Sequence, residues 1–203
     1  MGFDASYQAL PDGCTVLEHT IRDPKIAEVV SFVPYFVMMR HTNRPRGDAQ
    51  ALLQSLVNDL IAEHPGIEDR NYCYYDRRWD ALHYLLSEGR RNGAWREHRD
   101  LGTKAVRGSI ELNAHAQAVQ GIPVMYVPPE DVQDVAAMLA SCSPAKLRHL
   151  YDPVRMEQQG VYKFWADRAT EVEWNAIMEF LHGLSVLYEA AAVHHEGVLV
   201  VID

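Results

Sequence analysis

The stretch that decides the fold is DRRWDALHYLLSEG, residues 76–89, because it carries the signals of one complete helix. Asp76 is a residue type that accepts hydrogen bonds from the unpaired amides of a first helical turn. Gly89 readily adopts the left-handed conformation that ends a helix. Between them, apolar side chains at helical spacing form one stripe: Trp79, Leu82, Leu85 and Leu86. We therefore predict a helix whose apolar face packs inside the protein.

Strand and helix patterns lie on both sides of this helix. Residues 2–10 and 124–127 have strand character, and residues 198–202 form a continuous apolar run, which is typical of a strand buried on both faces. Residues 48–61 carry apolar side chains at helical spacing and predict an amphipathic helix. The sequence thus combines many helices with few strands.

The C-terminal helical region is predicted to contain two helices. Thr170 and Glu173 form a capping box, the usual start of a helix. Gly183 is predicted to end that helix, and a last helix then precedes the closing strand. Because helices and strands do not alternate regularly, we expect an α+β fold: a single helix-rich domain over residues 1–203 with a small mixed sheet.

Residues 90–108 differ from their surroundings because they are rich in Arg, Gly and Asn and poor in apolar residues. We predict that they form an exposed insertion. The chain of 203 residues is long enough for one substantial core, and two domains are not required.

The composition excludes several classes of protein. There are 28 acidic and 19 basic residues, a formal charge of −9, and a field of this sign repels phosphate backbones. We therefore expect no nucleic-acid partner, whereas a basic protein would be attracted. No apolar run approaches membrane-spanning length, so no membrane association is expected.

The cysteines and the absence of common catalytic motifs further limit the possible functions. Cys14, Cys73 and Cys142 are odd in number and far apart, which argues against disulfides and thiolate zinc sites and favours a reducing cytoplasm. The sequence contains no phosphate-binding glycine loop, GxSxG elbow or HExxH motif. We accordingly predict no catalytic residues, no metal and no cofactor.

Asp80 and His83 are the one pair that suggests chemistry. Residues three apart share a helix face, so the carboxylate could orient the imidazole for acid–base work or for ligand contact. The structural alternative is a negative charge near the helix start beside a partly buried histidine. The sequence favours the structural alternative, because no nucleophile or metal set lies near these residues along the chain.

Aromatic residues supply the remaining candidate contacts, because tyrosine and tryptophan frequently anchor interfaces. Tyr84 borders the apolar stripe of the central helix, and Trp95 lies in the predicted insertion. Tyr126 belongs to a predicted strand, and Trp165 to an aromatic cluster that begins at Tyr162. Together with Asp80 and His83, these four residues make up the predicted binding set.

Four segments resemble the YfbM-like bacterial family, a family of unknown function. Residues 79–86, WDALHYLL, are similar to its "WD-x-hydrophobic-H-x-LL" helix. Residues 126–132 resemble the family's strand and TPEEV helix start, and residues 150–156 resemble its "xFDPxxM" turn. Residues 180–202 are similar to its closing helix and strand. The resemblance is clearest over residues 72–203.

The resemblance implies a single α+β domain in the bacterial cytoplasm and carries no established reaction. It leaves two hypotheses. The first is a non-catalytic binding protein, most concretely an immunity protein that neutralises a bacterial toxin, for example a basic toxin that degrades nucleic acid, by direct contact. The alternative is an uncharacterised enzyme or small-ligand-binding protein with a cleft near Asp80 and His83. The oligomeric state is left open.

Overall fold

The computed structural model describes residues 4–39, 45–74, 77–89, 100–116 and 123–203. The strands of these residues form one five-stranded sheet in the order β2-β1-β5-β4-β3. In chain order they are β1 (Ala5–Pro11), β2 (Asn71–Tyr74), β3 (Ile110–Glu111), β4 (Val124–Val127) and β5 (Glu196–Ile202). Each pair of neighbouring strands is antiparallel. The helix-rich α+β fold is thus confirmed, but the sheet is not mixed, because apolar patterning does not encode strand direction.

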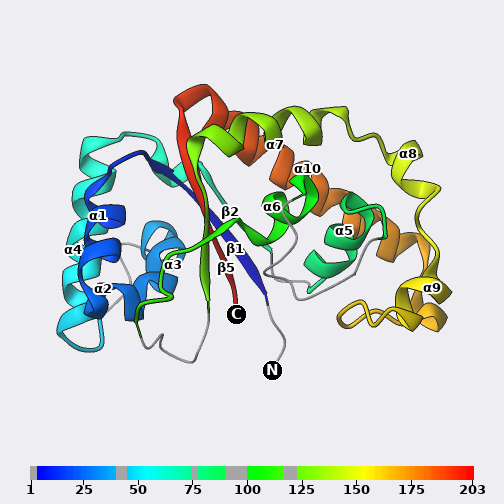
Figure 1. The fold of residues 1–203 in the computed structure, drawn as a ribbon, viewed down its shortest axis with the longest axis horizontal. Helices are drawn as coiled ribbons and strands as arrows, with labels where there is room; N and C mark the ends of the chain where they lie inside the picture. Colours follow the sequence, from blue (N-terminus) through cyan, green and yellow to red (C-terminus); the bar gives the residue numbers. More distant parts are fainter. Residues whose placement is uncertain (1–3, 40–44, 75–76, 90–99, 117–122) are drawn as a thin grey trace.

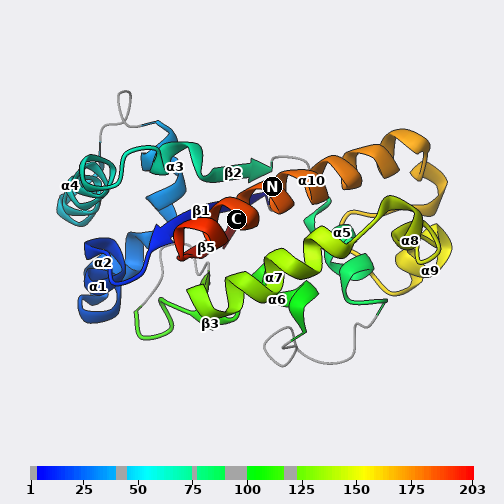
Figure 2. The same cartoon turned by 90° about the horizontal axis from the view of Figure 1, so that it is seen from above.

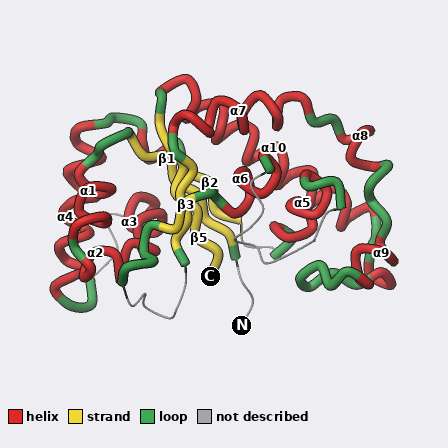
Figure 3. The backbone as a smooth tube through the Cα atoms, viewed as in Figure 1, coloured by secondary structure: helices red, strands yellow, loops and turns green. Residues whose placement is uncertain are grey.

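Helices form a layer on each face of the sheet (Figures 1 and 3). In the described residues they are α1 (Thr15–Arg22), α2 (Pro24–Val29), α3 (Val33–Met38), α4 (Asp48–Glu63), α5 (Trp79–Leu86), α6 (Leu101–Arg107), α7 (Pro129–Ser141), α8 (Pro144–Arg148), α9 (Pro153–Gln158) and α10 (Glu171–His194). Helices α1–α4 lie on one side, whereas α6, α7 and α10 pack against the other. Seen from above, α8 and α9 lie at the end of the molecule opposite α1, α2 and α4 (Figure 2).

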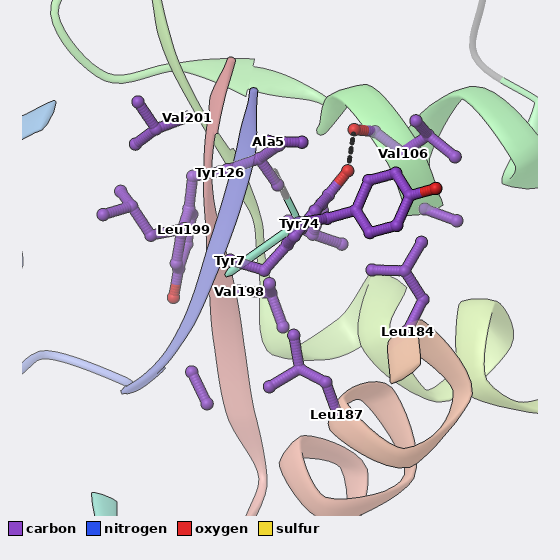
Figure 4. Close-up of a cluster of buried hydrophobic side chains, with 14 of the residues drawn as sticks. Ala5, Tyr7, Tyr74, Val106, Tyr126, Leu184, Leu187, Val198, Leu199 and Val201 are labelled. Atoms are coloured by element: carbon purple, nitrogen blue, oxygen red, sulfur yellow. Dashed lines mark hydrogen bonds between the residues drawn. The ribbon is translucent and has the colours of Figure 1, made fainter. Parts of the chain in front are cut away.

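The central strands are buried on both faces. Tyr7 of β1 faces the α10 side, where its hydroxyl donates to the Val106 carbonyl of α6 at 2.9 Å (Figure 4). Leu199 of β5 pairs with Tyr126 of β4 and points to the opposite side, toward α1–α4. All four residues are buried. Leu199 belongs to the C-terminal apolar run, whose burial on both faces was predicted.

Helix α10 runs without a break through Gly183, so the predicted division into two helices is wrong. A β-carbon at Gly183 would lie only 2.2 Å from the Tyr72 ring of β2, which shows how closely the ring packs on the helix backbone. Tyr72 and Tyr74 both stack on Phe180 of α10, with ring centroids 5.9 and 4.2 Å apart. The glycine therefore serves close packing rather than helix termination.

The length and composition of α10 would also allow it to cross a membrane, with a mean hydropathy of 1.3 over its most apolar 18 residues. This result differs from the expectation drawn from apolar runs alone. In the structure, residues of α10 contact both the sheet and α7. Eight of its 24 residues are buried, so its packing in the core accounts for part of its apolar content.

The predicted central helix is observed as α5, and Trp79, Leu82 and Leu85 are buried. Gly89 has a positive φ of 73°, and its amide donates to the Tyr84 carbonyl at 2.8 Å, as expected of a C-terminal glycine. The predicted cap Asp76 lies outside the described residues.

The predicted exposed insertion, residues 90–108, is wrong in its second half. Residues 90–99 lie outside the described residues, but residues 101–107 form α6, and most of that helix is buried. A β-carbon at Gly102 would lie 2.7 Å from the Leu86 carbonyl carbon, so α6 packs closely against the end of α5. The small side chains of α6 allow this contact. Because the segment contains few large apolar residues, its sequence predicts exposure instead of packing.

The contact of Tyr72 with Gly183 gives the first prediction. Replacing Gly183 by Ala should lower the free energy of unfolding by about 1–3 kcal/mol, because the added methyl group overpacks the core. Alanine is the better helix former, so helix propensity alone predicts the opposite sign. Urea denaturation measures the difference. The double variant Gly183→Ala, Tyr72→Ala should cost less than the sum of the two single changes; additivity would contradict the proposed contact.

Candidate functional site

The structure divides the predicted binding residues into a buried group and an exposed residue. The buried group, with exposed fractions of 1, 5, 2 and 7%, consists of Asp80, His83, Tyr84 and Tyr126. Trp165 is 43% exposed, and Trp95 lies outside the described residues. Asp80 and His83 are brought together, with Nδ1 of His83 3.6 Å from Oδ1 of Asp80. Trp165 is therefore the described member of the set that can contact a partner protein.

Asp80 lies in the first turn of α5 and joins three segments of the chain. Its Oδ1 accepts a hydrogen bond from Nη2 of Arg107 in α6 at 3.0 Å. Its Oδ2 accepts a hydrogen bond from the Tyr162 amide at 2.8 Å. Both carboxylate oxygens are thus used within the protein, in the pairing that a buried charge requires.

His83 lies one turn further along α5, close to Asp80, and faces a second carboxylate through Thr103. Its Nε2 is 3.1 Å from the hydroxyl of Thr103 in α6. That hydroxyl donates to Oδ2 of Asp100 at 3.0 Å, so it accepts from the imidazole. Asp100 also caps α6 through the Thr103 amide and accepts from the Ser87 hydroxyl. The result is a polar network that holds α5 and α6 together.

The network changes the acidity of its members. Burial on its own would raise the pKa of Asp100, but hydrogen bonds from Thr103 and Ser87, together with nearby His83, lower it below the usual 3.8. Burial lowers the pKa of Arg107. The Arg107 guanidinium lies 5.1 Å from the centroid of the Trp79 ring, and that ring stacks on Tyr162. Charge and aromatic contacts therefore support each other at this junction.

The order Asp80, His83 and Thr103 has the sequence of roles found in a catalytic triad: an orienting acid, a base and a hydroxyl. Two observations oppose a catalytic role. Thr103 is only 2% exposed, and its hydroxyl proton is directed to Asp100 rather than to the base. Within the described residues, no group of three potential ligands could hold a metal ion. The arrangement is suited to fixing the packing of α5 on α6.

Sequence reasoning missed Asp100, Thr103 and Arg107, because all three lie in the segment predicted to be an exposed insertion. One signal was available. Asp100 precedes a helical segment, and its side chain reaches the amide three residues later, which is the usual N-cap pattern. The contacts of Asp100 and Thr103 with α5, however, cannot be predicted from their neighbours in the sequence.

Removing the charge of Asp80 should be strongly destabilising. We expect Asp80→Asn to lose about 3–5 kcal/mol of unfolding free energy, because Arg107 then remains largely buried without its carboxylate. Chemical denaturation is the measurement. The matched control is Glu171→Gln, whose partner Arg148 is exposed, and here the loss should stay below about 1 kcal/mol. Equal effects of the two changes would argue against the network.

Asp100 predicts a dependence of stability on pH. Because its pKa is lowered by folding, its ionised form stabilises the native state at pH values above the ordinary pKa of 3.8. This contribution is lost as the pH falls from 3.8 through the lowered native value. We expect the stability difference between the native sequence and Asp100→Asn to shrink over that range. Denaturation curves from pH 6 to pH 2.5 test this, and a difference independent of pH would contradict it.

Comparison with known proteins gives the family and the fold. No curated protein matches the chain. Among solved structures, a protein of unknown function, YfbM from Escherichia coli, is similar with a TM-score of 0.55 and 14% identity, over 98% of this chain and 99% of that chain. Residues 41–201 match the domain of unknown function DUF1877, a range that begins well before the resemblance seen in the sequence. The chain therefore belongs to the DUF1877 family and has the YfbM-like fold.

Proposed function

We propose that this chain is a non-catalytic binding protein, most concretely an immunity protein that neutralises a basic bacterial toxin by covering it. The observation that carries the proposal is a helical layer that is both acidic and unusually apolar at its surface. Residues 12–39 and 45–69, which include α1–α4, contain nine Asp and Glu but only three Lys and Arg. We call this region the acidic layer.

Large apolar side chains are exposed on the acidic layer. They are Ile21 (62% exposed), Tyr35 (44%), Met38 (40%), Met39 (37%) and Leu52 (44%). Single exposed apolar residues are common, but five occur in this one layer, four of them on its helices, and on this ground we propose an interaction surface. Tyrosine and methionine are enriched at the centres of protein interfaces, and methionine adapts its shape to a partner.

Exposed carboxylates on the same layer favour a basic partner. Asp12, Glu18, Asp48, Asp59 and Glu63 are all exposed. Complementary charge accelerates the encounter of two proteins and disfavours wrong partners. A basic toxin domain would be attracted to this layer, and its apolar contacts would then determine how long the complex persists.

The buried polar network supports the non-catalytic form of the proposal. Asp80 and His83, the pair on which an enzyme hypothesis depends, are engaged in packing α5 against α6. Three separate cysteines, Cys14, Cys73 and Cys142, are unbridged, which suits a reducing compartment. Our proposal accordingly includes a location in the bacterial cytoplasm.

The test is capture and reconstitution. The tagged chain should retain one basic protein from an extract of its host at low salt, and the complex should weaken as salt is raised. The purified pair should then form a complex of defined stoichiometry, and co-expression should protect cells from that partner's toxicity. Recovery of no protein partner, or of a partner whose toxicity is unaffected, would overturn the proposal.

Matched variants locate the contact. Leu52→Ser and Tyr35→Ala should each weaken the reconstituted complex at least tenfold, because hot-spot truncations cost about 1.4 kcal/mol or more. The control is Val186→Ser, which changes an exposed apolar residue of α10 outside the acidic layer (53% exposed) and should leave affinity unchanged. Circular dichroism verifies that each variant is folded.

A further inference from the structure

We infer that the chain also associates with a second copy of itself, head to tail, through two surfaces of opposite charge at its two ends. One surface is the acidic layer. The other, which we call the basic end, comprises residues 144–168 with α8 and α9. This inference goes beyond the proposed function, because it concerns the chain without any partner.

The basic end differs in charge from the rest of the molecule. Residues 144–168 contain five Lys and Arg but only three Asp and Glu, a local charge of +2 in a chain of −9. The other residues therefore carry 14 basic and 25 acidic side chains. All five basic residues of this segment are exposed: Lys146, Arg148, Arg155, Lys163 and Arg168. Arg148 is paired with Glu171, which lies just outside the segment, so four basic side chains remain beside three exposed acidic ones.

An exposed tryptophan lies among these charges. Trp165 is 43% exposed, and Val154 of α9 is 57% exposed. Lys163 Nζ and Arg168 Cζ lie 5.9 and 5.0 Å from the centroid of a Trp165 ring. Tryptophan and arginine dominate the energetics of protein interfaces, and the guanidinium can keep its ring contact while pairing with a carboxylate. The basic end thus offers an aromatic anchor with cations beside it.

The two surfaces are complementary in charge and both contain exposed apolar side chains. They lie at opposite ends of the long axis, so one molecule cannot bring its own two surfaces together (Figures 1 and 2). A contact between unlike surfaces is heterologous, and it adds further copies instead of closing as a two-fold dimer, unless the rotation happens to form a ring. A basic toxin bound to the acidic layer would displace the second copy.

Sedimentation velocity of the purified chain tests the inference. At low ionic strength the average mass should rise with concentration beyond that of a dimer, and at 0.5 M NaCl the chain should return to monomer. Trp165→Ala should lower the association constant at least tenfold, and Lys163→Glu with Arg168→Glu should abolish association. Val186→Ser serves as the control and should associate like the native chain.

A mixing experiment distinguishes a head-to-tail contact from a symmetric one. Trp165→Ala combined with Lys163→Glu and Arg168→Glu blocks the basic end, whereas Leu52→Ser with Asp59→Lys blocks the acidic layer. Each variant alone should be monomeric. An equimolar mixture should form dimers and nothing larger, because one intact surface of each kind remains.

Three outcomes would overturn the inference: a native chain that stays monomeric at every concentration, a two-fold dimer that does not grow, or a mixture of the two variants that does not associate. Because these measurements use the purified chain alone, their failure leaves the capture of a basic partner untouched. Conversely, self-association can be observed even if no toxin is found.

Discussion

The antiparallel pairing of β1 with β5 is the contact on which the rest of the structure depends. It joins the two ends of the chain in register over seven residues, from Ala5 with Ile202 to Pro11 with Glu196. Both strands lie inside the sheet and are almost completely buried, so water must be excluded from both faces. Two helical layers satisfy this requirement, and the positions of the proposed surfaces follow from them.

The two layers have different chemistry. The layer of α1–α4 covers the sheet with apolar side chains inward and presents acidic and apolar residues outward. The opposite layer is held together partly by polar contacts, in which Asp80 connects α5 to Arg107 and to the distant Tyr162 amide. Such a network is costly to bury, and it is retained where it fixes one arrangement of helices. The buried polar residues of the second layer are thus separate from the surface of α1–α4 that we propose for binding.

The basic end, with α8 and α9, and the acidic layer lie at opposite ends of the molecule (Figure 2), so the two proposed surfaces could be occupied independently. The five-stranded sheet lies between them. Binding at one end therefore does not need any rearrangement at the other, and competition arises only where two ligands share one surface.

Much of the fold could be predicted from the sequence because its signals are local. The central helix, the capping box at Thr170 and the apolar strand at residues 198–202 depend on periodicity and on caps within a few residues. The family resemblance was recognised from similarly local motifs. Burial of the candidate site was only partly predictable: the sequence favoured a structural role for Asp80 and His83, but the partners of these residues lie 20 to 82 positions away.

Other features were decided by the tertiary structure alone. Gly183 has the local character of a helix breaker, yet the ring of Tyr72 packs against it and the helix continues. Residues 101–107 look like an exposed insertion, yet their small side chains allow α6 to approach α5. The antiparallel direction of the strands is also absent from local patterns. In each case the stabilising free energy comes from contacts between segments distant in the sequence. These contacts cannot be predicted from a residue's neighbours along the chain.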